Sequence, residues 1–511
     1  MSYLELLKLA STEAVVVVTA LVVLAIGLTT RREATGVTVA TAQGDQNVGG
    51  SSGARTNAIC SFIAALGLAI AIGTALMLPR KATLFSGMLV ITPLTSLFKI
   101  ICMALAFFAV LLTKSEKSLR HPGEYLAILL LATVGLMLLV GSEELLMIFI
   151  GLELLGLSLY VMVAFDKTDV RSAEAGLKYF LFGSTSSAFT LFGISLIYGM
   201  SGITSLAAIS EKLATVSVQP LLAVGIVMTL IGFAFKIAAA PFHLWAPDAY
   251  QGAPIPSAAF IASGSKVASF VVLGKIVLVG FAPLHGDAAW HAMVAGWSPV
   301  LAALAALSIL VGNFVALAQS NLRRLLAYSA VAHAGYTLIG LVAGDREGFS
   351  AALFYTTTYA ITLVGAFGVV ALVRRETGGD DLSNFSGLIS RSPMLAGCMS
   401  IFMLSLAGIP PLAGFFGKFY LFSVALRADA GHGLLWLVAV ALFGSLISLY
   451  YYLIVLKVIF VDEPSLAIAS SPDHLSPDLL QRIAVAVLAA VVLFLGLMPD
   501  ALAAGLLAAM P

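Results

Sequence analysis

The fold of this chain is decided by residues 232–270, GFAFKIAAAPFHLWAPDAYQGAPIPSAAFIASGSKVASF. The stretch begins and ends within apolar runs long enough to cross a bilayer, yet it contains Lys236, Pro241, His243 and Lys266. A charged side chain at bilayer depth costs about 2.5–3.5 kcal/mol even on lenient insertion scales, so two such lysines indicate a functional site. Pro241 interrupts the helix and frees carbonyl groups that lipid cannot satisfy. The stretch therefore predicts a broken helix that lines a hydrated, protonatable path.

The composition of the whole chain is that of a membrane protein. Of its 511 residues, 60% are hydrophobic and only 10% are charged, whereas soluble domains carry about 25% charged residues. The net charge of +1 gives no reason to expect a nucleic acid as a partner. Cys60, Cys102 and Cys398 lie singly in apolar runs, so they build neither a disulfide framework nor iron–sulfur spacing. We expect a polytopic all-α protein whose surroundings are the lipid bilayer.

About fourteen runs reach the roughly 20 apolar residues that a spanning helix needs. They lie near 12–30, 57–78, 88–112, 124–141, 143–164, 174–199, 220–243, 256–281, 295–318, 324–343, 349–373, 394–424, 433–460 and 482–508. Loops after odd-numbered helices hold most of the lysines and arginines. The positive-inside rule then puts those loops in the cytoplasm and both termini on the far, periplasmic side.

The chain is expected to divide into four parts. Residues 1–123 hold helices 1–3, residues 124–281 form a first five-helix unit, and residues 295–460 form a second. Residues 461–511 hold a polar loop, at 462–480, and helix 14. Each unit has one proline-broken helix with a lysine: Lys236 before Pro241 in helix 7, and Lys418 after Pro410 and Pro411 in helix 12. Five is an odd number, so the two repeats are inverted, as in ion-handling transporters.

Glu153 and Lys178 are the first candidate functional residues. Glu153 lies deep in the run MIFIGLELLGLSLYVMVAF, where a carboxyl group must be protonated or held by a cation from another helix. Glu174 and Lys178 are four residues apart and share a helix face. This pair is interpreted either as a surface ion pair or as part of the path, with Lys178 as the residue expected to meet Glu153.

Lys236, His243 and Lys266 follow in the deciding stretch. Lys236 comes after fifteen apolar or small residues, so its proton affinity depends on how near a carboxylate lies. His243 is expected either to relay a proton or to bond a freed carbonyl. Lys266 is again deep in helix 8. Lys275 lies nine residues further, close enough to the far surface for its ammonium to snorkel.

His333, Tyr336 and Lys418 complete a row of ionisable groups. His333 and Tyr336 are three residues apart, so one helix face presents both to a hydrogen-bonded water wire. Lys418 comes after the second proline break, whereas Lys236 comes before the first. Together these residues form a carboxylate–lysine–lysine–histidine–lysine row that runs sideways through the middle of the bundle. We expect a proton path in the membrane plane with inlets near the two breaks.

Five motifs resemble the antiporter-like membrane subunits of respiratory complex I. They are GLELLGLSLYVMVAFD (151–166), EAGLKYFLFGS (174–184), FKIAAAPFHLWAPDAYQGAP (235–254), NLRRLLAYSAVAHAGY (321–336) and GIPPLAGFFGKFY (408–420). The resemblance covers about 124–460. Helices 1–3 and 14 fit the fourteen-helix plan of that family with less distinctive sequence.

The resemblance implies roles for single residues. Glu153 matches the glutamate of helix 5 and Lys236 the lysine of helix 7, the pair that drives proton transfer in the family. Lys178 would be the partner of Glu153 on helix 6, Lys266 the connecting residue, His333 the central histidine and Lys418 the exit group. M-type members have glutamate at the last position, and L-type members carry a long lateral helix, so the N-type fits best.

The expected function is therefore proton translocation as a membrane-arm subunit of a bacterial NADH–quinone oxidoreductase, in the inner membrane. Electron transfer elsewhere in the complex drives it, and the flavin, the iron–sulfur clusters and the quinone belong to partner subunits. Expected neighbours are an M-type subunit and small membrane subunits. Three alternatives stay open: a subunit of a multi-subunit Na⁺/H⁺ antiporter, a subunit of a related membrane-bound hydrogenase or ferredoxin oxidoreductase, and a structural subunit that conducts nothing.

Overall fold

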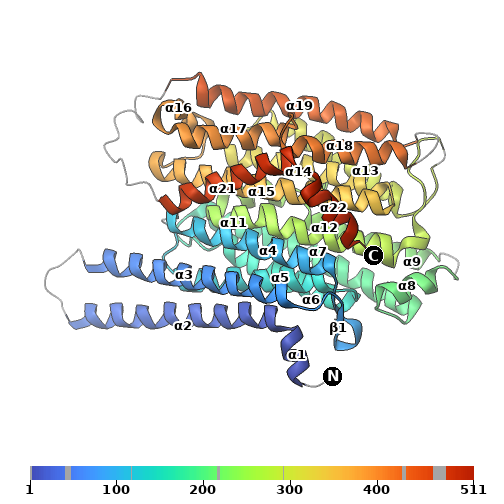
Figure 1. Ribbon diagram of the computed structural model, residues 1–511, viewed down its shortest axis with the longest axis horizontal. Helices are drawn as coiled ribbons and strands as arrows, with labels where there is room; N and C mark the ends of the chain where they lie inside the picture. The colour runs from blue at the N-terminus through green and yellow to red at the C-terminus, as the bar shows by residue number, and fades with distance from the viewer. Residues whose placement is uncertain are drawn as a thin grey trace.

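The computed structural model describes residues 3–40, 48–116, 118–215, 219–291, 293–428, 433–463 and 479–510. Figure 1 shows a bundle of nearly parallel helices, with the N- and C-terminal ends of the chain at the same end of the bundle. Among the described residues, 12 helices are long and apolar enough to cross a membrane. Helices dominate because each satisfies its own backbone hydrogen bonds, which lipid cannot do.

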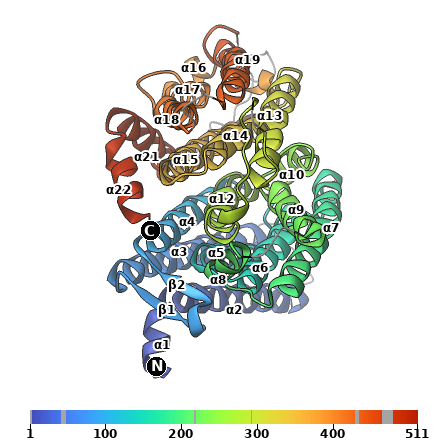
Figure 2. The same ribbon diagram turned by 90° about the vertical axis from the view of Figure 1, so that its right-hand side faces the viewer.

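The N-terminal part packs on one side of the bundle and includes a hairpin that the sequence did not predict. Its elements are α1 (Tyr3–Leu9), α2 (Ser11–Ala40), α3 (Val48–Met77), β1 (Ala82–Leu84), β2 (Leu89–Ile91) and α4 (Pro93–Leu112). The strands β1 and β2 pair antiparallel, with Ala82 opposite Ile91. This hairpin lies at the membrane face that carries both chain ends, beside the amino end of α4 (Figure 2).

The first five-helix unit contains one interrupted helix and one helix with local π-turns. Its elements are α5 (Pro122–Gly141), α6 (Leu145–Val163), α7 (Val170–Ser201), the short α8 (Leu206–Leu213), α9 (Pro220–Lys236), α10 (Trp245–Gly252), α11 (Ile255–Phe260) and α12 (Lys266–Lys275). The π-helical turn Ile261–Ser265 joins α11 to α12, and a second, Ile276–Gly280, follows α12. Lys266 and Lys275 thus stand at the two ends of α12, each next to a π-turn, and such turns are frequent at functional sites.

The second unit and the C-terminal part follow the same plan. Their elements are α13 (Trp297–Ala316), α14 (Leu322–Val342), α15 (Arg346–Thr377), α16 (Leu388–Arg391), α17 (Pro393–Ala407), α18 (Ala413–Arg427), α19 (Leu435–Phe460), α21 (Leu479–Leu497) and α22 (Asp500–Ala509). The expected single helix at 482–508 is wrong, because Pro499 separates α21 from α22. Most of the expected polar loop at 462–480 lies outside the described residues.

Both expected helix breaks are present, and each one ends its helix instead of only bending it. The helix expected over 220–243 ends at Lys236, since Ala238 adopts a left-handed φ of 58°. In the second unit α17 ends at Gly408, whose φ is 86°, and α18 begins after Pro410 and Pro411. The chain enters α9 and α17 from opposite ends of the bundle (Figure 1), which is the inverted relation that an odd repeat requires.

The most deeply buried helices stand in the middle of the bundle. In the hydropathic windows of α14 and of the helix that runs from α11 through α12, 94% of the residues are buried, against 28% in α2. Figure 2, which looks along the helices, shows α12, α14 and α15 between the α5–α9 group and the α17–α19 group. Lys266 and His333, in the middle of these central helices, are therefore buried by the rest of the chain.

Candidate functional site

Glu153 lies on α6 and is half-buried. Its carboxylate accepts a hydrogen bond of 2.5 Å from the hydroxyl of Ser187 on α7. Lys178 is nine residues before Ser187 on α7, a separation of about 14 Å along a helix. Lys178 instead forms ion pairs with Glu174 at 2.7 Å and with Asp248 on α10 at 2.8 Å. The expected meeting of Lys178 with Glu153 is therefore wrong, because the two side chains stand at different depths.

Lys236 is the last residue of α9, and it is buried. Its Nζ is among the buried side-chain atoms of the described chain that have no hydrogen-bond partner. The ammonium lies 5.5 Å from the ring centroid of Tyr160, and a Cβ built on Gly156 would come within 2.9 Å of it. Gly156 follows Glu153 by three residues on α6, so the two share a helix face. Glu153 and Lys236 thus interact electrostatically across α6 and α9.

His243 lies in the segment between α9 and α10. It is buried, its Nδ1 has no hydrogen-bond partner among the described residues, and its ring is 6.2 Å from that of Tyr328 on α14. Among the described residues, neither a hydrogen bond nor a ring contact joins His243 to Lys236 or Lys266. His243 therefore faces the second unit rather than the Glu153–Lys236 pair.

Lys266 joins the first unit to the second. It begins α12 directly after the π-turn, and its Nζ donates a hydrogen bond of 2.6 Å to the carbonyl of Ala330 on α14. The ammonium is also 5.7 Å from the ring of Tyr359 on α15. A lysine whose polar contacts reach the neighbouring unit can pass a proton across the boundary between the units.

His333 is the centre of a cluster of aromatic hydroxyls on α14, α15 and α19. Its Nδ1 hydrogen-bonds with the hydroxyl of Tyr355 at 2.7 Å and its Nε2 with that of Tyr452 at 3.1 Å. The ring stacks on Tyr359, 4.7 Å away, and meets Tyr336 edge-on at 5.7 Å. The Tyr336 hydroxyl accepts from the Asn313 amide at 3.1 Å. Both ring nitrogens of His333 are thus engaged, which suits a residue that receives a proton on one side and releases it on the other.

Lys418 lies on α18, just after the second break. Its Nζ donates to the carbonyl of Ala407, the last residue of α17, and to the hydroxyl of Ser445 on α19, both at 2.9 Å. The ammonium is 5.2 Å from the ring of Tyr336. The lysine therefore satisfies one of the carbonyls that the broken helix exposes.

The structure joins part of the predicted row and leaves one gap. Contacts run without interruption from Lys266 through Tyr359 and His333 to Tyr336 and Lys418. In the described part of the chain no hydrogen bond, ion pair or ring contact links Lys236 to Lys266. Lys236 Nζ and the Tyr359 hydroxyl are buried without partners, and buried polar groups of this kind are normally satisfied by ordered water. Proton transfer along the row thus needs water at these two groups, and also wherever neighbours in the row are in ring contact without a hydrogen bond.

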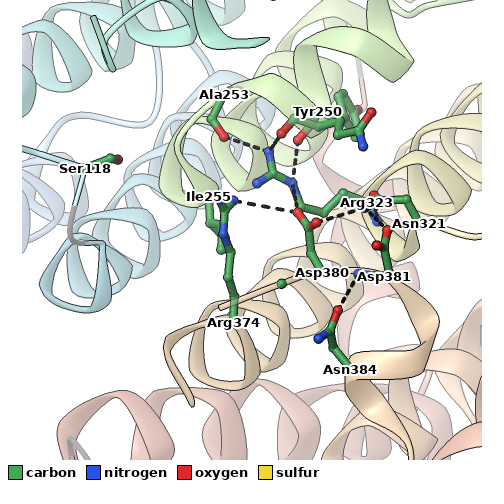
Figure 3. Close-up of polar contacts among 12 residues, drawn as sticks. Ser118, Tyr250, Ala253, Ile255, Asn321, Arg323, Arg374, Asp380, Asp381 and Asn384 are labelled. Carbon is green, nitrogen blue, oxygen red and sulfur yellow. Dashed lines mark hydrogen bonds and ion pairs between the residues drawn. The ribbon is translucent and has the colours of Figure 1, made fainter. Parts of the chain in front are cut away.

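Arg323 is a structural residue that sequence reasoning missed. It lies at the start of α14 with a fully buried side chain, and its guanidinium donates to the backbone carbonyls of Tyr250, Gln251 and Ala253 (Figure 3). Its Nε also lies 3.2 Å from the carboxylate of Asp380, which precedes α16. Arginine suits this position because its five donors can serve the carboxyl end of α10 and an acid together. The motif NLRR contained the signal, but only the fold shows which carbonyls it meets.

Asp248 fastens α10 to both units. Its carboxylate accepts from Lys178 on α7 at 2.8 Å and from Arg324 on α14 at 2.6 Å. Arg324 thus holds the side chain of Asp248, and Arg323 holds the carboxyl end of α10. α10 is the helix that follows the break after α9. The amino end of α10 is fixed by its first residue, Trp245, whose indole N–H donates to the carbonyl of Phe235 on α9. The break next to Lys236 is therefore held at a defined geometry.

Arg323→Met is expected to destabilise the folded protein strongly. Removal of one partner of a buried ion pair costs about 3–5 kcal/mol, because the other charge is left buried alone. Thermal unfolding in detergent, followed by size-exclusion chromatography, should show a lower midpoint than wild type. The control is Arg427→Met, at an exposed arginine on α18, which should leave the midpoint unchanged. Equal midpoints for the two variants would contradict the role given to Arg323.

Inverted five-helix units, two broken helices and a buried lysine–histidine row define an ion-translocating membrane bundle of the antiporter type. The chain belongs to the NADH:quinone oxidoreductase/Mrp antiporter transmembrane family, and residues 142–448 are the part that matches the sequence pattern of this family.

Individual relatives agree with this assignment. The chain is 49% identical to NADH-quinone oxidoreductase subunit N 2 of Acidobacterium capsulatum over 84% of its length and 87% of that protein. It superposes on a chain of respiratory complex I from Thermus thermophilus with a TM-score of 0.76 at 31% identity, covering 97% of this chain and 99% of that one. A chain of the Mrp complex from Dietzia shares the fold, with a TM-score of 0.76 at 22% identity and 97% of each chain covered.

Proposed function

We propose that this chain is the N-type proton-translocating subunit of an NADH–quinone oxidoreductase membrane arm. One observation carries the proposal beyond family membership: the contacts that run from Lys266 through Tyr359, His333 and Tyr336 to Lys418. They cross from the first unit to the second within the most buried part of the bundle. A structural subunit has no need of such a row, because each buried ionisable group costs free energy.

The geometry supports a revised trigger for proton transfer. Glu153 lies near Lys236, whereas Lys178 is engaged with Glu174 and Asp248, so a change at Glu153 acts on Lys236 directly. Lys236 then passes its proton through water to Lys266. From there it reaches Lys418 by way of His333 and Tyr336, again with water between them, because these groups are in ring contact without a hydrogen bond among the described residues. Moving one charge against 100 mV costs about 2.3 kcal/mol. A change of two pKa units is worth about 2.7 kcal/mol, so a modest electrostatic change at Lys236 is sufficient.

The proposed location is the bacterial inner membrane, with both termini on the periplasmic side. Two observations support this orientation. The ends of the chain lie at one end of the bundle (Figure 1). The opposite end carries Arg323 and Arg324 at the start of α14 and Arg374 and Arg375 at the end of α15, as expected for the cytoplasmic side.

The redox chemistry is assigned to partner subunits. This chain supplies lysines, histidines and tyrosines, which transfer protons, and we propose that the flavin, the iron–sulfur clusters and the quinone are held elsewhere in the complex. An M-type subunit and small membrane subunits are the proposed neighbours. The partly exposed Glu153 on α6 and the exposed apolar side chains of α6 and α7 offer a surface for one of them.

The assignment predicts redox-driven pumping without sodium exchange. The complex that copurifies with this chain after mild detergent extraction should reduce quinone with NADH and, in sealed vesicles, move protons as it does so. A sodium gradient imposed on the same vesicles without NADH should cause no pH change. A sodium-dependent pH change without NADH would instead assign the chain to a Na⁺/H⁺ antiporter, and quinone reduction with ferredoxin alone would assign it to a ferredoxin-dependent complex.

A further inference from the structure

A large cavity opens away from the proton row, on the face that carries both chain ends. Its volume is about 850 Å³. The β1–β2 hairpin, the end of α12, the start of α15 and the end of α22 surround it, and Figure 2 looks onto this face. Arg346 holds the α22 wall in place, because its guanidinium donates to the carbonyls of Leu507 at 3.0 Å and Met510 at 2.7 Å. Ionisable side chains in the lining are Lys81, Glu143, Lys275, Asp345 and Arg346.

Lys275 is the innermost of these ionisable residues. Its side chain is only 6% exposed, so the expected snorkelling to the surface is wrong. The Nζ turns inward and donates to the carbonyls of Val140 at 3.0 Å and Ser142 at 3.3 Å, at the end of α5. Glu143, at the cavity wall, is 3.7 Å from the same nitrogen. The cavity therefore ends at an ion pair whose lysine is buried and whose glutamate is 44% exposed.

A second ion pair, in which both side chains are largely buried, lies against the same helix end. Lys99 on α4 contacts Glu13 on α2 at 2.6 Å, with side chains that are 6% and 14% exposed. A Cβ built on Gly141 would lie 3.3 Å from the Lys99 nitrogen, so Lys99 and Lys275 lie on either side of the end of α5. Capping of one helix end needs one cation. The two lysines and two glutamates together carry no net charge, and Lys275 and Glu143 are the members that line the cavity.

Two helices, α12 and α15, run from this cluster to the proton row. Lys275 and Lys266 are the two ends of α12, about 14 Å apart at the rise of a helix. On α15, Phe349 lines the cavity and Tyr359 lies beside Lys266. Between them Thr357 has a buried hydroxyl without a partner in the described chain, a group that water normally satisfies.

We propose that the cavity is an aqueous vestibule through which Lys275 exchanges protons with the compartment on the side of the chain ends. It gives the first five-helix unit an outlet of its own, separate from Lys418 in the second unit. At the mouth, burial raises the pKa of the Asp345 carboxyl, opposed by a hydrogen bond from the Gly348 N–H. The role of Lys275 in proton exchange rests on the proposed proton-pumping function. Water access to the cavity does not depend on that function.

Access is tested by cysteine labelling in the intact complex in sealed vesicles. Cys60, Cys102 and Cys398 are buried and are first replaced by alanine. Lys275→Cys should react with a charged, membrane-impermeant thiosulfonate added from the side of the chain ends. We expect a rate at least about tenfold above that from the other side, the ratio that a barrier difference of about 1.4 kcal/mol produces. The control is Val272→Cys, fully buried on the same helix, which should stay unlabelled. Equal rates for the two cysteines, or labelling of Lys275→Cys only from the opposite side, would overturn the vestibule.

Proton exchange is tested with Lys275→Arg. Arginine keeps the charge and can serve the carbonyls of α5, but it does not release its proton. The variant should lower the number of protons moved per electron while quinone reduction continues. A wild-type ratio would show that Lys275 only caps α5 and would overturn its role in proton exchange. If wild-type vesicles do not pump at all, the proposed function fails, and the labelling result stands separately.

Discussion

Lys236→Met is expected to stop proton transfer through this chain almost completely. Methionine has a similar volume and keeps the contacts with Tyr160 and Gly156, but it cannot bind a proton. A proton at this depth would then have only water around it, at a cost of about 2.5–3.5 kcal/mol, which slows transfer about a hundredfold. The measurement is the ratio of protons moved to electrons transferred in vesicles that contain the complex.

The control for this variant is Lys457→Met. Lys457 lies near the end of α19, its side chain is 64% exposed, and its ion pair with Asp462 is at 3.3 Å. Exposed pairs of this kind contribute little, about 0–1 kcal/mol. The control should pump as wild type does. A wild-type ratio in Lys236→Met itself would remove Lys236 from the proton path and with it the proposed trigger at Glu153.

Lys418→Arg is expected to fold normally and to fail in proton transfer. The guanidinium can still donate to the carbonyl of Ala407 and the hydroxyl of Ser445, so the broken helix keeps its partner. Arginine stays protonated under all physiological conditions, however. The proton that arrives through His333 and Tyr336 therefore cannot be accepted and released at this position, and the proton-to-electron ratio should fall as it does in Lys236→Met.

Two comparisons make the Lys418 result interpretable. Thermal unfolding of Lys418→Arg should match wild type, which would show that the loss is not a folding defect. Lys457→Arg, the same exchange at an exposed position, should leave both unfolding and pumping unchanged. A pumping, stable Lys418→Arg protein would mean that Lys418 acts as a fixed charge rather than as a proton carrier.

Much of the fold could be predicted because lipid restricts the chain so severely. A run of about 20 apolar residues in a bilayer has almost no alternative to a helix, and both proline breaks were visible in the sequence. The errors fall where a local signal is weak. The helix expected over 220–243 ends early, at Lys236, because Ala238 turns left-handed three residues before Pro241. α22 separates from α21 at a single proline.

The candidate residues were predictable as types and depths, but their partners were not. Lys178 lies on the expected helix, yet it faces Asp248, because one helix presents side chains at different heights to different neighbours. Lys275 was expected to reach the surface, and it turns inward to the end of α5. In the sequence, Arg323 has the pattern of an ordinary cytoplasmic arginine. The fold shows that three carbonyls of the α10 segment surround it.

The sequence by itself determined that this chain spans a membrane, that two of its helices break beside lysines, and that costly ionisable groups remain in the apolar interior. Hydrophobicity and backbone chemistry are local properties, so they can be read along the chain. The row and the pairing of Glu153 with Lys236 were expected. Only the tertiary structure decided which side chains contact one another along the row, that Lys178 faces Asp248, and that a cavity leads to Lys275. These relations depend on how helices far apart in sequence are rotated and staggered against each other, and that is settled by packing.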